Sequence, residues 1–150
     1  MKQIRFTQKG FEELKKKYEE LKNARPPAVL DLKKARDMGD LSENGYYKSA
    51  RSKLSQIDHT LRNLLFQIKG ASVVVHTNKD FIGIGSKVIL RNKEKELAIE
   101  LVGDMESDPA KKKISLLSPI GRALEGKKAG DKIEIQTPQG KNFYVIIKVS

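Results

Sequence analysis

Two acidic residues stand three positions apart in the segment Gly39-Asp-Leu-Ser-Glu-Asn44. If Asp40 and Glu43 both lie on the first turn of a helix, their side chains are about 5–6 Å apart on one face. Carboxylate oxygens are the ligands that Mg²⁺ prefers, and the ion keeps several of its waters. The pair is therefore a candidate for completing the coordination of a divalent cation.

Helix capping is a second explanation for the same two acids. Asp40 could cap the helix with its carboxylate, and Glu43 at the third helical position would then close a capping box. Both negative charges would also be favourable at the positive end of the helix dipole. Spacing does not separate the two explanations.

The elements on either side of the acids have the apolar spacing of a coiled-coil seam, with alternating steps of three and four. Two facing stripes predict an antiparallel hairpin with its turn near Gly39. A second helix from about Glu43 to Lys69 would be roughly 40 Å long. The seam residues are Phe11, Leu14, Tyr18, Leu21, Ala28, Leu32 and Ala35, then Tyr47, Ala50, Leu54, Ile57, Leu61, Leu64 and Ile68.

Five further residues bear on the ends and continuity of the helices. Thr7 is the expected N-cap of the first helix, and Gly70 is the expected stop of the second. Pro26 and Pro27 predict a kink or a restart of the first helix, since neither has an N–H and each ring crowds the preceding turn. Arg25 occupies the seam position between Leu21 and Ala28.

The second half of the chain breaks into short runs of strand-forming residues separated by Gly, Pro and Asp. Ser118-Pro119 opens a short helical turn between the fourth and fifth runs. We therefore expect an α+β chain, with a helical hairpin over residues 1–72 and an antiparallel sheet with one short helix over residues 73–150. The expected strands are Ser72–His76, Lys87–Leu90, Glu96–Val102, Lys113–Leu117, Lys132–Gln136 and Asn142–Val149.

Composition restricts the partner and the chemistry. Lys and Arg number 30 against 19 Asp and Glu, a formal net charge of +11, which favours an anionic partner such as nucleic acid.

The absence of Cys excludes disulfides, thiolate metal sites and Cys nucleophiles. His59 and His76 lack a third ligand nearby, which argues against a metal site. No apolar run is long enough for a membrane span, so we expect a soluble, cytoplasmic monomer that does not bind membranes.

Basic and aromatic residues follow the acids on the expected second helix. Lys48, Arg51 and Lys53 could contact the phosphates of a nucleic acid such as RNA, although a solvated basic face explains them equally well. Tyr46 lies off the seam and could stack on a base, whereas Tyr47 belongs to the seam and is expected to pack.

Four segments resemble, in order and spacing, the signature motifs of the bacterial transcript-cleavage factors of the GreA/GreB family, especially its GreA type. The resemblance spans nearly the whole chain. The family usually carries Ala and an acidic residue where Gly45 and Tyr46 stand here. The four segments are Gly39-Asp-Leu-Ser-Glu-Asn44 followed by Tyr47, Ser118-Pro-Ile-Gly-Arg-Ala-Leu-Glu-Gly126, Gly130-Asp131 and Thr137-Pro-Gln-Gly140.

This resemblance implies a fold and a partner. It implies an N-terminal coiled-coil hairpin that enters the secondary channel of RNA polymerase and a C-terminal FKBP-like domain that docks on the polymerase. The residues that it suggests for docking are Ser118, Pro119, Ile120 and Arg122.

It also implies the role of the tip. Asp40 and Glu43, with Ser42 and Asn44 as neighbours, would help to hold the second Mg²⁺ of the polymerase, which then hydrolyses backtracked nascent RNA. The protein would not be an enzyme and would hold no Mg²⁺ in isolation, since two carboxylates offer too few ligands. The alternatives are an inhibitor that occludes the same channel and a non-catalytic coiled-coil module that binds nucleic acid or protein.

Overall fold

The computed structural model describes residues 3–39, 44–93 and 95–150. The chain forms two compact units. One is Glu12–Gly70, and the other joins the first eleven residues to Ala71–Ser150. The sequence patterns did not indicate that the N-terminal residues would join the second unit.

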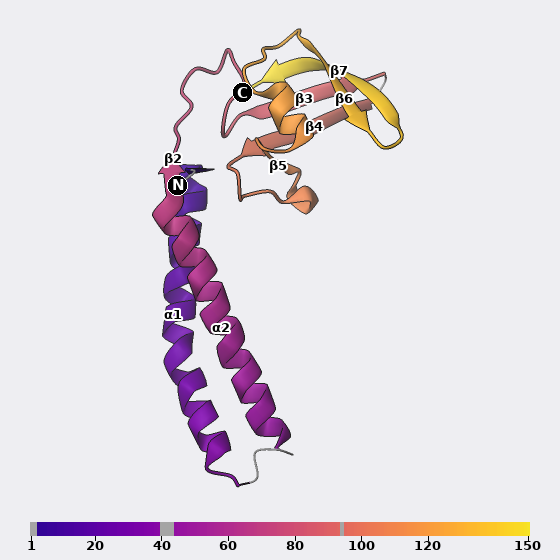
Figure 1. Cartoon of the computed structure of the whole chain (residues 1–150). Helices are drawn as coiled ribbons and strands as arrows, with labels where there is room; N and C mark the ends of the chain where they lie inside the picture. Colours follow the sequence, from indigo (N-terminus) through magenta and orange to yellow (C-terminus); the bar gives the residue numbers. More distant parts are fainter. Residues whose placement is uncertain (1–2, 40–43, 94) are drawn as a thin grey trace. The chain divides into compact units, whose positions relative to one another are not determined.

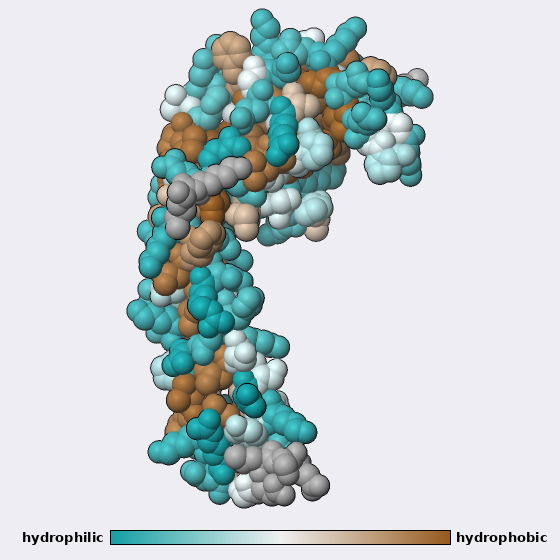
Figure 2. Space-filling model, in the orientation of Figure 1, coloured by the Kyte–Doolittle hydropathy of each residue, from teal (hydrophilic) through white to brown (hydrophobic). Residues whose placement is uncertain are grey.

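The first unit is an antiparallel pair of helices, α1 (Gln8–Arg36) and α2 (Gly45–Gly70) (Figure 1). The predicted seam is confirmed, because each of its apolar residues is buried or half-buried. Some of these seam residues are buried, among them Ala35 and Ile57, and the others are half-buried. Hydrophilic residues cover much of the visible face of the hairpin (Figure 2).

The prediction at Pro26 and Pro27 was a kink or a restart; the restart does not occur, because α1 continues through both residues. A proline removes the donor to the carbonyl four residues earlier, here those of Lys22 and Asn23. All four residues are exposed. Water can therefore satisfy the two carbonyls, and the helix remains unbroken.

Arg25 is the polar member of the seam, and it pairs with Asp58 on the other helix. Its Nε donates to Asp58 Oδ1 at 2.6 Å, and its Nη2 donates to Oδ2 at 3.3 Å. This hydrogen bond, helped by the positive charge of Arg25, lowers the pKa of Asp58 below its ordinary value. The pair replaces an apolar contact at this level of the seam.

The second unit contains a five-stranded sheet with the order β5-β4-β3-β7-β6. Neighbouring strands are antiparallel except β4 and β5, which are parallel, so the sheet is mixed rather than wholly antiparallel. The 3-10 helix η1 (Pro109–Lys111) precedes β5, and the short helix α3 (Pro119–Leu124) follows it. The strands are β3 (Lys87–Asn92), β4 (Lys95–Val102), β5 (Lys113–Ser115), β6 (Lys132–Thr137) and β7 (Gly140–Val149).

One buried cluster forms the core of this sheet. Leu124 of α3 is fully buried in it, so α3 packs on the sheet through its C-terminal end. The cluster consists of Ile82, Ile84, Val88, Leu90, Ile99, Leu101, Leu116, Leu124, Ile133, Ile135 and Ile146.

A separate two-stranded sheet holds the N-terminal segment within the second unit. Strand β1 (Ile4–Phe6) pairs in parallel with β2 (Ala71–Val73), where the sequence predicted a longer strand over 72–76 and none near residue 5. The Arg5 N–H donates to Asp104 at 2.8 Å, and the Thr7 N–H donates to Glu106 at 2.8 Å. Thr7 also accepts from the Gly10 N–H at 3.0 Å, which confirms it as the N-cap of α1.

Candidate functional site: the hairpin tip and the Ser118 turn

The hairpin tip contains the candidate acids. Asp40, Ser42 and Glu43 lie outside the described residues, whereas Gly39 and Asn44 on either side of them are described. Gly39 has a φ of +111°, a conformation that favours glycine. The chain therefore leaves the end of α1 through a turn that depends on this glycine.

Asn44 connects the two helices at the tip. Its Oδ1 accepts the N–H of Tyr47 at 3.1 Å, and its Nδ2 donates to the carbonyl of Ala35 at 3.1 Å. The first contact makes Asn44 the N-cap of α2. The second ties that cap to the end of α1, at a residue that is fully buried.

The position of this cap decides the capping explanation. The N-cap belongs to Asn44 and α2 begins at Gly45, so Asp40 is not the N-cap of α2 and Glu43 does not lie in its first turn. The geometry of the two carboxylates themselves lies outside the described residues. Gly45 stands at the first position of the helix, where glycine costs less than in the interior.

The basic residues that follow the tip are solvent-exposed. Lys48, Arg51 and Lys53 all lie on α2, and no described carboxylate forms an ion pair with any of them. Tyr46 is exposed, whereas Tyr47 is half-buried on the seam, as predicted. These bases are therefore available to an anionic ligand.

The turn at Ser118 shows how the second signature segment folds. The Ser118 Oγ accepts the N–H of Gly121 at 3.0 Å and donates to the carbonyl of Ser115 at 2.7 Å. Pro119 occupies the first turn of α3, where no N–H is needed. A Cβ on Gly121 would lie 2.1 Å from the Ser115 carbonyl oxygen, so only glycine permits α3 to pack this closely.

Folding does not account for every residue of this turn. Pro119 and Arg122 are exposed and Ile120 is half-buried, and no described carboxylate forms an ion pair with Arg122. Ser118, Pro119 and Ile120 line a groove of about 530 Å³ together with apolar residues of β4 and β6. The groove and Arg122 together form a surface that a partner could contact.

Two family models together match almost all of the chain. The model described as the N-terminal part of a transcription elongation factor matches residues 4–73. The model described as the C-terminal part of the transcription elongation factor GreA/GreB matches residues 69–150. The chain belongs to the GreA/GreB family of transcription elongation factors.

Individual GreA/GreB relatives agree with this assignment. The transcription elongation factor GreA of Orientia tsutsugamushi (strain Ikeda) is 39% identical over 154 residues, which cover 99% of this chain and 97% of the relative. GreA of Acholeplasma laidlawii is 37% identical over 95% of this chain and 92% of the relative. A solved structure of the transcription factor Gfh1 has a TM-score of 0.50 and 23% identity over 99% of both chains, which shows a likeness of fold alone. The predicted fold, a helical hairpin followed by an FKBP-like sheet with a short helix, is thus confirmed.

The remaining GreA/GreB motifs form turns. The Asp131 carboxylate accepts the N–H of Lys128 at 2.9 Å, and the Thr137 hydroxyl donates to the carbonyl of Gly140 at 2.8 Å. Gly130 and Gly140 both have positive φ, at +93° and +127°. These motifs are therefore explained by local folding.

Within the described part of this GreA/GreB chain, no three His, Asp or Glu side chains gather as metal ligands. His59 contacts Asn63, and His76 contacts the carbonyl of Phe81. No described helix is long and apolar enough to cross a membrane. The acids at the tip are the remaining candidates for holding a cation, and their hard oxygen donors suit Mg²⁺.

Proposed function

We propose that this GreA/GreB protein inserts its hairpin into the secondary channel of RNA polymerase and stimulates the polymerase's own cleavage of backtracked nascent RNA. The position of Asn44 carries the proposal. Because Asn44 caps α2, that cap does not need Asp40 or Glu43, and we assign both acids to another molecule. Their place in the chain is at the turn between the two helices.

The chemistry assigned to the tip is electrostatic. Mg²⁺, held jointly with the polymerase's acids, supplies an activated water and stabilises the charge that develops on the phosphate. Asp40 and Glu43 contribute carboxylate oxygens to that shared site, with Ser42 beside them. Asn44 ties the end of α1 to the start of α2.

Cleavage by this chain alone is not expected. Mg²⁺ sheds its water reluctantly, and two carboxylates leave most of its coordination to solvent. The protein therefore acts as a factor that completes the polymerase's site rather than as a nuclease.

The exposed bases of α2 suit the substrate of that reaction. Phosphate contacts from Lys48, Arg51 and Lys53 would hold the 3′ segment of the RNA without regard to its sequence. These residues follow the tip on α2 and have no described acidic partner.

The groove at Ser118, Pro119 and Ile120, with Arg122, is the surface that we assign to polymerase docking. Ser118 and Gly121 set the conformation of the turn, whereas Pro119, Ile120 and Arg122 present the contacts. Arg122→Gln should weaken binding to polymerase, measured by competition for a labelled wild-type protein. Lys127→Gln, which removes an exposed charge just beyond α3, should bind normally.

Stalled, backtracked elongation complexes test the function. The wild type should shorten the transcript, and Asp40→Asn and Glu43→Gln should each slow this shortening by at least about tenfold, as expected for losing groups that act on the transition state. Asp37→Asn, which removes an exposed acid just before the tip, should retain the activity and serves as the control. Slower elongation without shortening would instead indicate an inhibitor, and no effect on transcription would indicate a binding module.

A further inference from the structure

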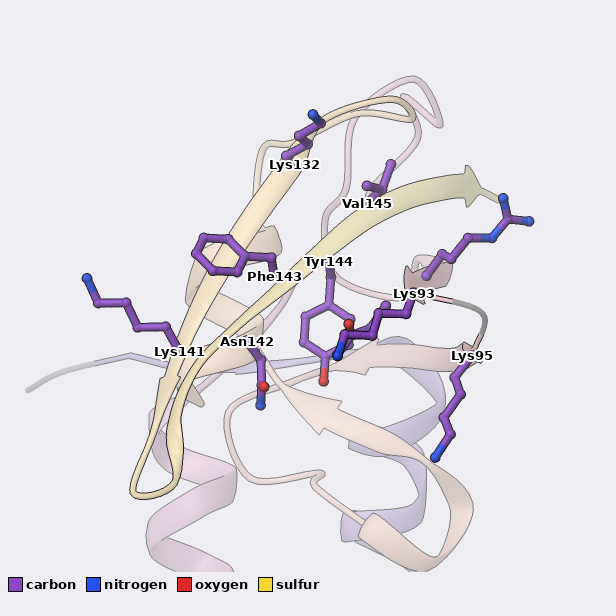
Figure 3. Close-up of a pocket in the computed structure, with 10 residues that line it drawn as sticks. Lys93, Lys95, Lys132, Lys141, Asn142, Phe143, Tyr144 and Val145 are labelled. Carbon is purple, nitrogen blue, oxygen red and sulfur yellow. The ribbon is translucent and has the colours of Figure 1, made fainter.

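A cleft in the sheet unit separates two hairpins of the main sheet. Strand β7 pairs with β3 only as far as Val145 opposite Arg91, and then continues back to Gly140 with β6 as its only partner. Strand β3 continues with β4 to the pair Asn92 and Lys95. The two hairpins part beyond Arg91 and Val145 and leave a cleft of about 1030 Å³ (Figure 3).

The lining of this cleft is strongly basic. Among the described residues, ten line the cleft, and they include five bases and no acid: Arg91, Lys93, Lys95, Lys132 and Lys141 among Asn92, Asn142, Phe143, Tyr144 and Val145. The bases come from both hairpins, so a bound anion would meet positive charge on two sides. Such a cleft concentrates anionic ligands.

Two of these bases already have acidic partners at the rim. Arg91 pairs with Glu96 at 2.7 Å, and Lys141 pairs with Glu134 at 3.3 Å. Lys93, Lys95 and Lys132 form no ion pair with any carboxylate in the described part of the chain, from which Glu94 is missing. Three cations therefore remain for a ligand.

The cleft also presents an aromatic ring. Phe143 is 62% exposed on the part of β7, Gly140–Val145, that pairs with β6, where it stands opposite Glu134. Tyr144, the next residue, packs against the buried core and anchors the strand at this point. Phe143 lies on the same strand face as Val145, whose cross-strand partner is Lys132. An exposed ring with a cation nearby is a combination that stacks an unpaired base while cations contact its phosphates.

We propose that this cleft binds single-stranded nucleic acid, with phosphates on Lys93, Lys95 and Lys132 and one base stacked on Phe143. An acidic peptide would satisfy the lysines but would leave the ring unused, and a duplex offers no unpaired base. The source of the strand rests on the proposed function, in which the protein meets the single-stranded 3′ segment of RNA. The cleft would be a second contact for that RNA, separate from the bases of α2.

Fluorescence anisotropy with a labelled oligo(U) of roughly ten nucleotides, within the usual site size of such folds, tests the cleft without polymerase. The full chain carrying Lys48→Gln, Arg51→Gln and Lys53→Gln serves as the parent, so that α2 does not mask the result. Adding Lys93→Gln, Lys95→Gln and Lys132→Gln should weaken binding about tenfold or more. It should also reduce the slope of log K against log salt by about 2, since each phosphate contact on a single strand contributes roughly 0.7.

A matched control removes the same charge elsewhere in the sheet unit. Lys79→Gln, Lys127→Gln and Lys128→Gln, all exposed and outside the cleft, should change the affinity less than about threefold. Equal losses in the two triple variants would overturn the proposal, because only the net charge would then matter.

The ring has its own test. Phe143→Leu keeps an apolar side chain on the strand and should weaken oligo(U) binding about tenfold through lost stacking. An oligo(U) carrying 5-iodouracil should crosslink to the peptide that contains Phe143. Unchanged affinity in Phe143→Leu, or a polyglutamate peptide that binds as tightly as oligo(U), would overturn the assignment to nucleic acid.

Two further outcomes show whether the bound strand is RNA or DNA and separate the cleft proposal from the proposed role in transcript cleavage. Oligo(dT) shares the phosphate and base chemistry, so binding of both oligomers supports the cleft as a single-strand site, and tighter binding of oligo(U) assigns it to RNA. The assay contains no polymerase, so its failure would leave the transcript-shortening result of Asp40→Asn and Glu43→Gln intact. Failure of transcript shortening would likewise leave the binding result intact.

Discussion

The hairpin tip and the Ser118 turn are both helix N-termini built in the same way. At each, a short polar side chain accepts an N–H three residues later, at 3.1 Å for Asn44 and 3.0 Å for Ser118. Each capping side chain also donates to a carbonyl of the preceding segment, that of Ala35 or that of Ser115. Both junctions thus lock a helix start to the chain before it.

The two junctions differ in what their signature residues are used for. In the Ser118 turn, Ser118 and Gly121 are needed by the fold, Pro119 is compatible with the first helical turn, and Arg122 is an exposed polar residue without a described ion pair. At the tip, Asn44 is the described residue that caps α2, and we assign the acids that precede it to the partner. A signature segment therefore combines residues that stabilise the fold with residues that we assign to a partner. Intramolecular hydrogen bonds and close contacts identify the first kind.

Gly121→Ala tests the folding side of this comparison and has the largest expected effect. Its Cβ would meet the Ser115 carbonyl at 2.1 Å, and relief of such overpacking costs about 1–3 kcal/mol of unfolding free energy. Urea denaturation followed by circular dichroism measures the loss. Gly45→Ala is the control, because a Cβ there meets nothing within 4 Å, and it should leave stability unchanged or raise it by about 0.5 kcal/mol.

The two capping residues should show nearly equal effects. Asn44→Ala and Ser118→Ala should each lower the free energy of unfolding by about 1 kcal/mol, the usual cost of a lost cap. Asn44→Asp keeps the acceptor but loses the donor to Ala35, so it should recover only part of the loss. If Asn44→Ala left thermal unfolding unchanged, the parallel between the two junctions would be wrong.

Neutralising the tip acids should affect stability less than either cap. Asp40→Asn and Glu43→Gln should stay within about 0.5 kcal/mol of the wild type in thermal or urea unfolding, as surface substitutions usually do. A loss close to that of Asn44→Ala in either variant would restore a structural role to the acid and weaken the proposed function.

The smallest effect is expected at Arg25 and Asp58, which stabilise the hairpin away from its tip. The folded-state pKa of Asp58 is lowered, so the stabilisation is present above the unfolded pKa of the carboxyl and is lost as pH falls through the folded value. Asp58→Asn should therefore be slightly less stable than the wild type near neutral pH, and the difference should vanish in acid. Urea midpoints across this pH range measure it, and added salt should shrink the difference, since both side chains are partly exposed.

Much of the fold could be predicted because it depends on the spacing of apolar and capping residues that are close together in the sequence. The seam from Tyr47 to Ile68 and the cap at Ser118 each depend on residues a few positions apart. Of the kink or restart predicted at Pro26, the restart was wrong for a reason that local rules omit, since exposure lets water replace the lost donors. The strand Ile4–Phe6 was missed because its pairing with Ala71–Val73 joins residues far apart in the chain.

The sequence determined the acids at the turn, the two helical faces, the strand runs and the family motifs, because each is a property of neighbouring residues. Only the tertiary structure decided which motif residues already have a hydrogen-bond partner or a close packing contact within the protein. Such a contact depends on where the carbonyl of another segment lies. It placed Asn44 against Ala35 and Gly121 against Ser115. It also brought lysines of two hairpins, some forty residues apart in the chain, around one cleft.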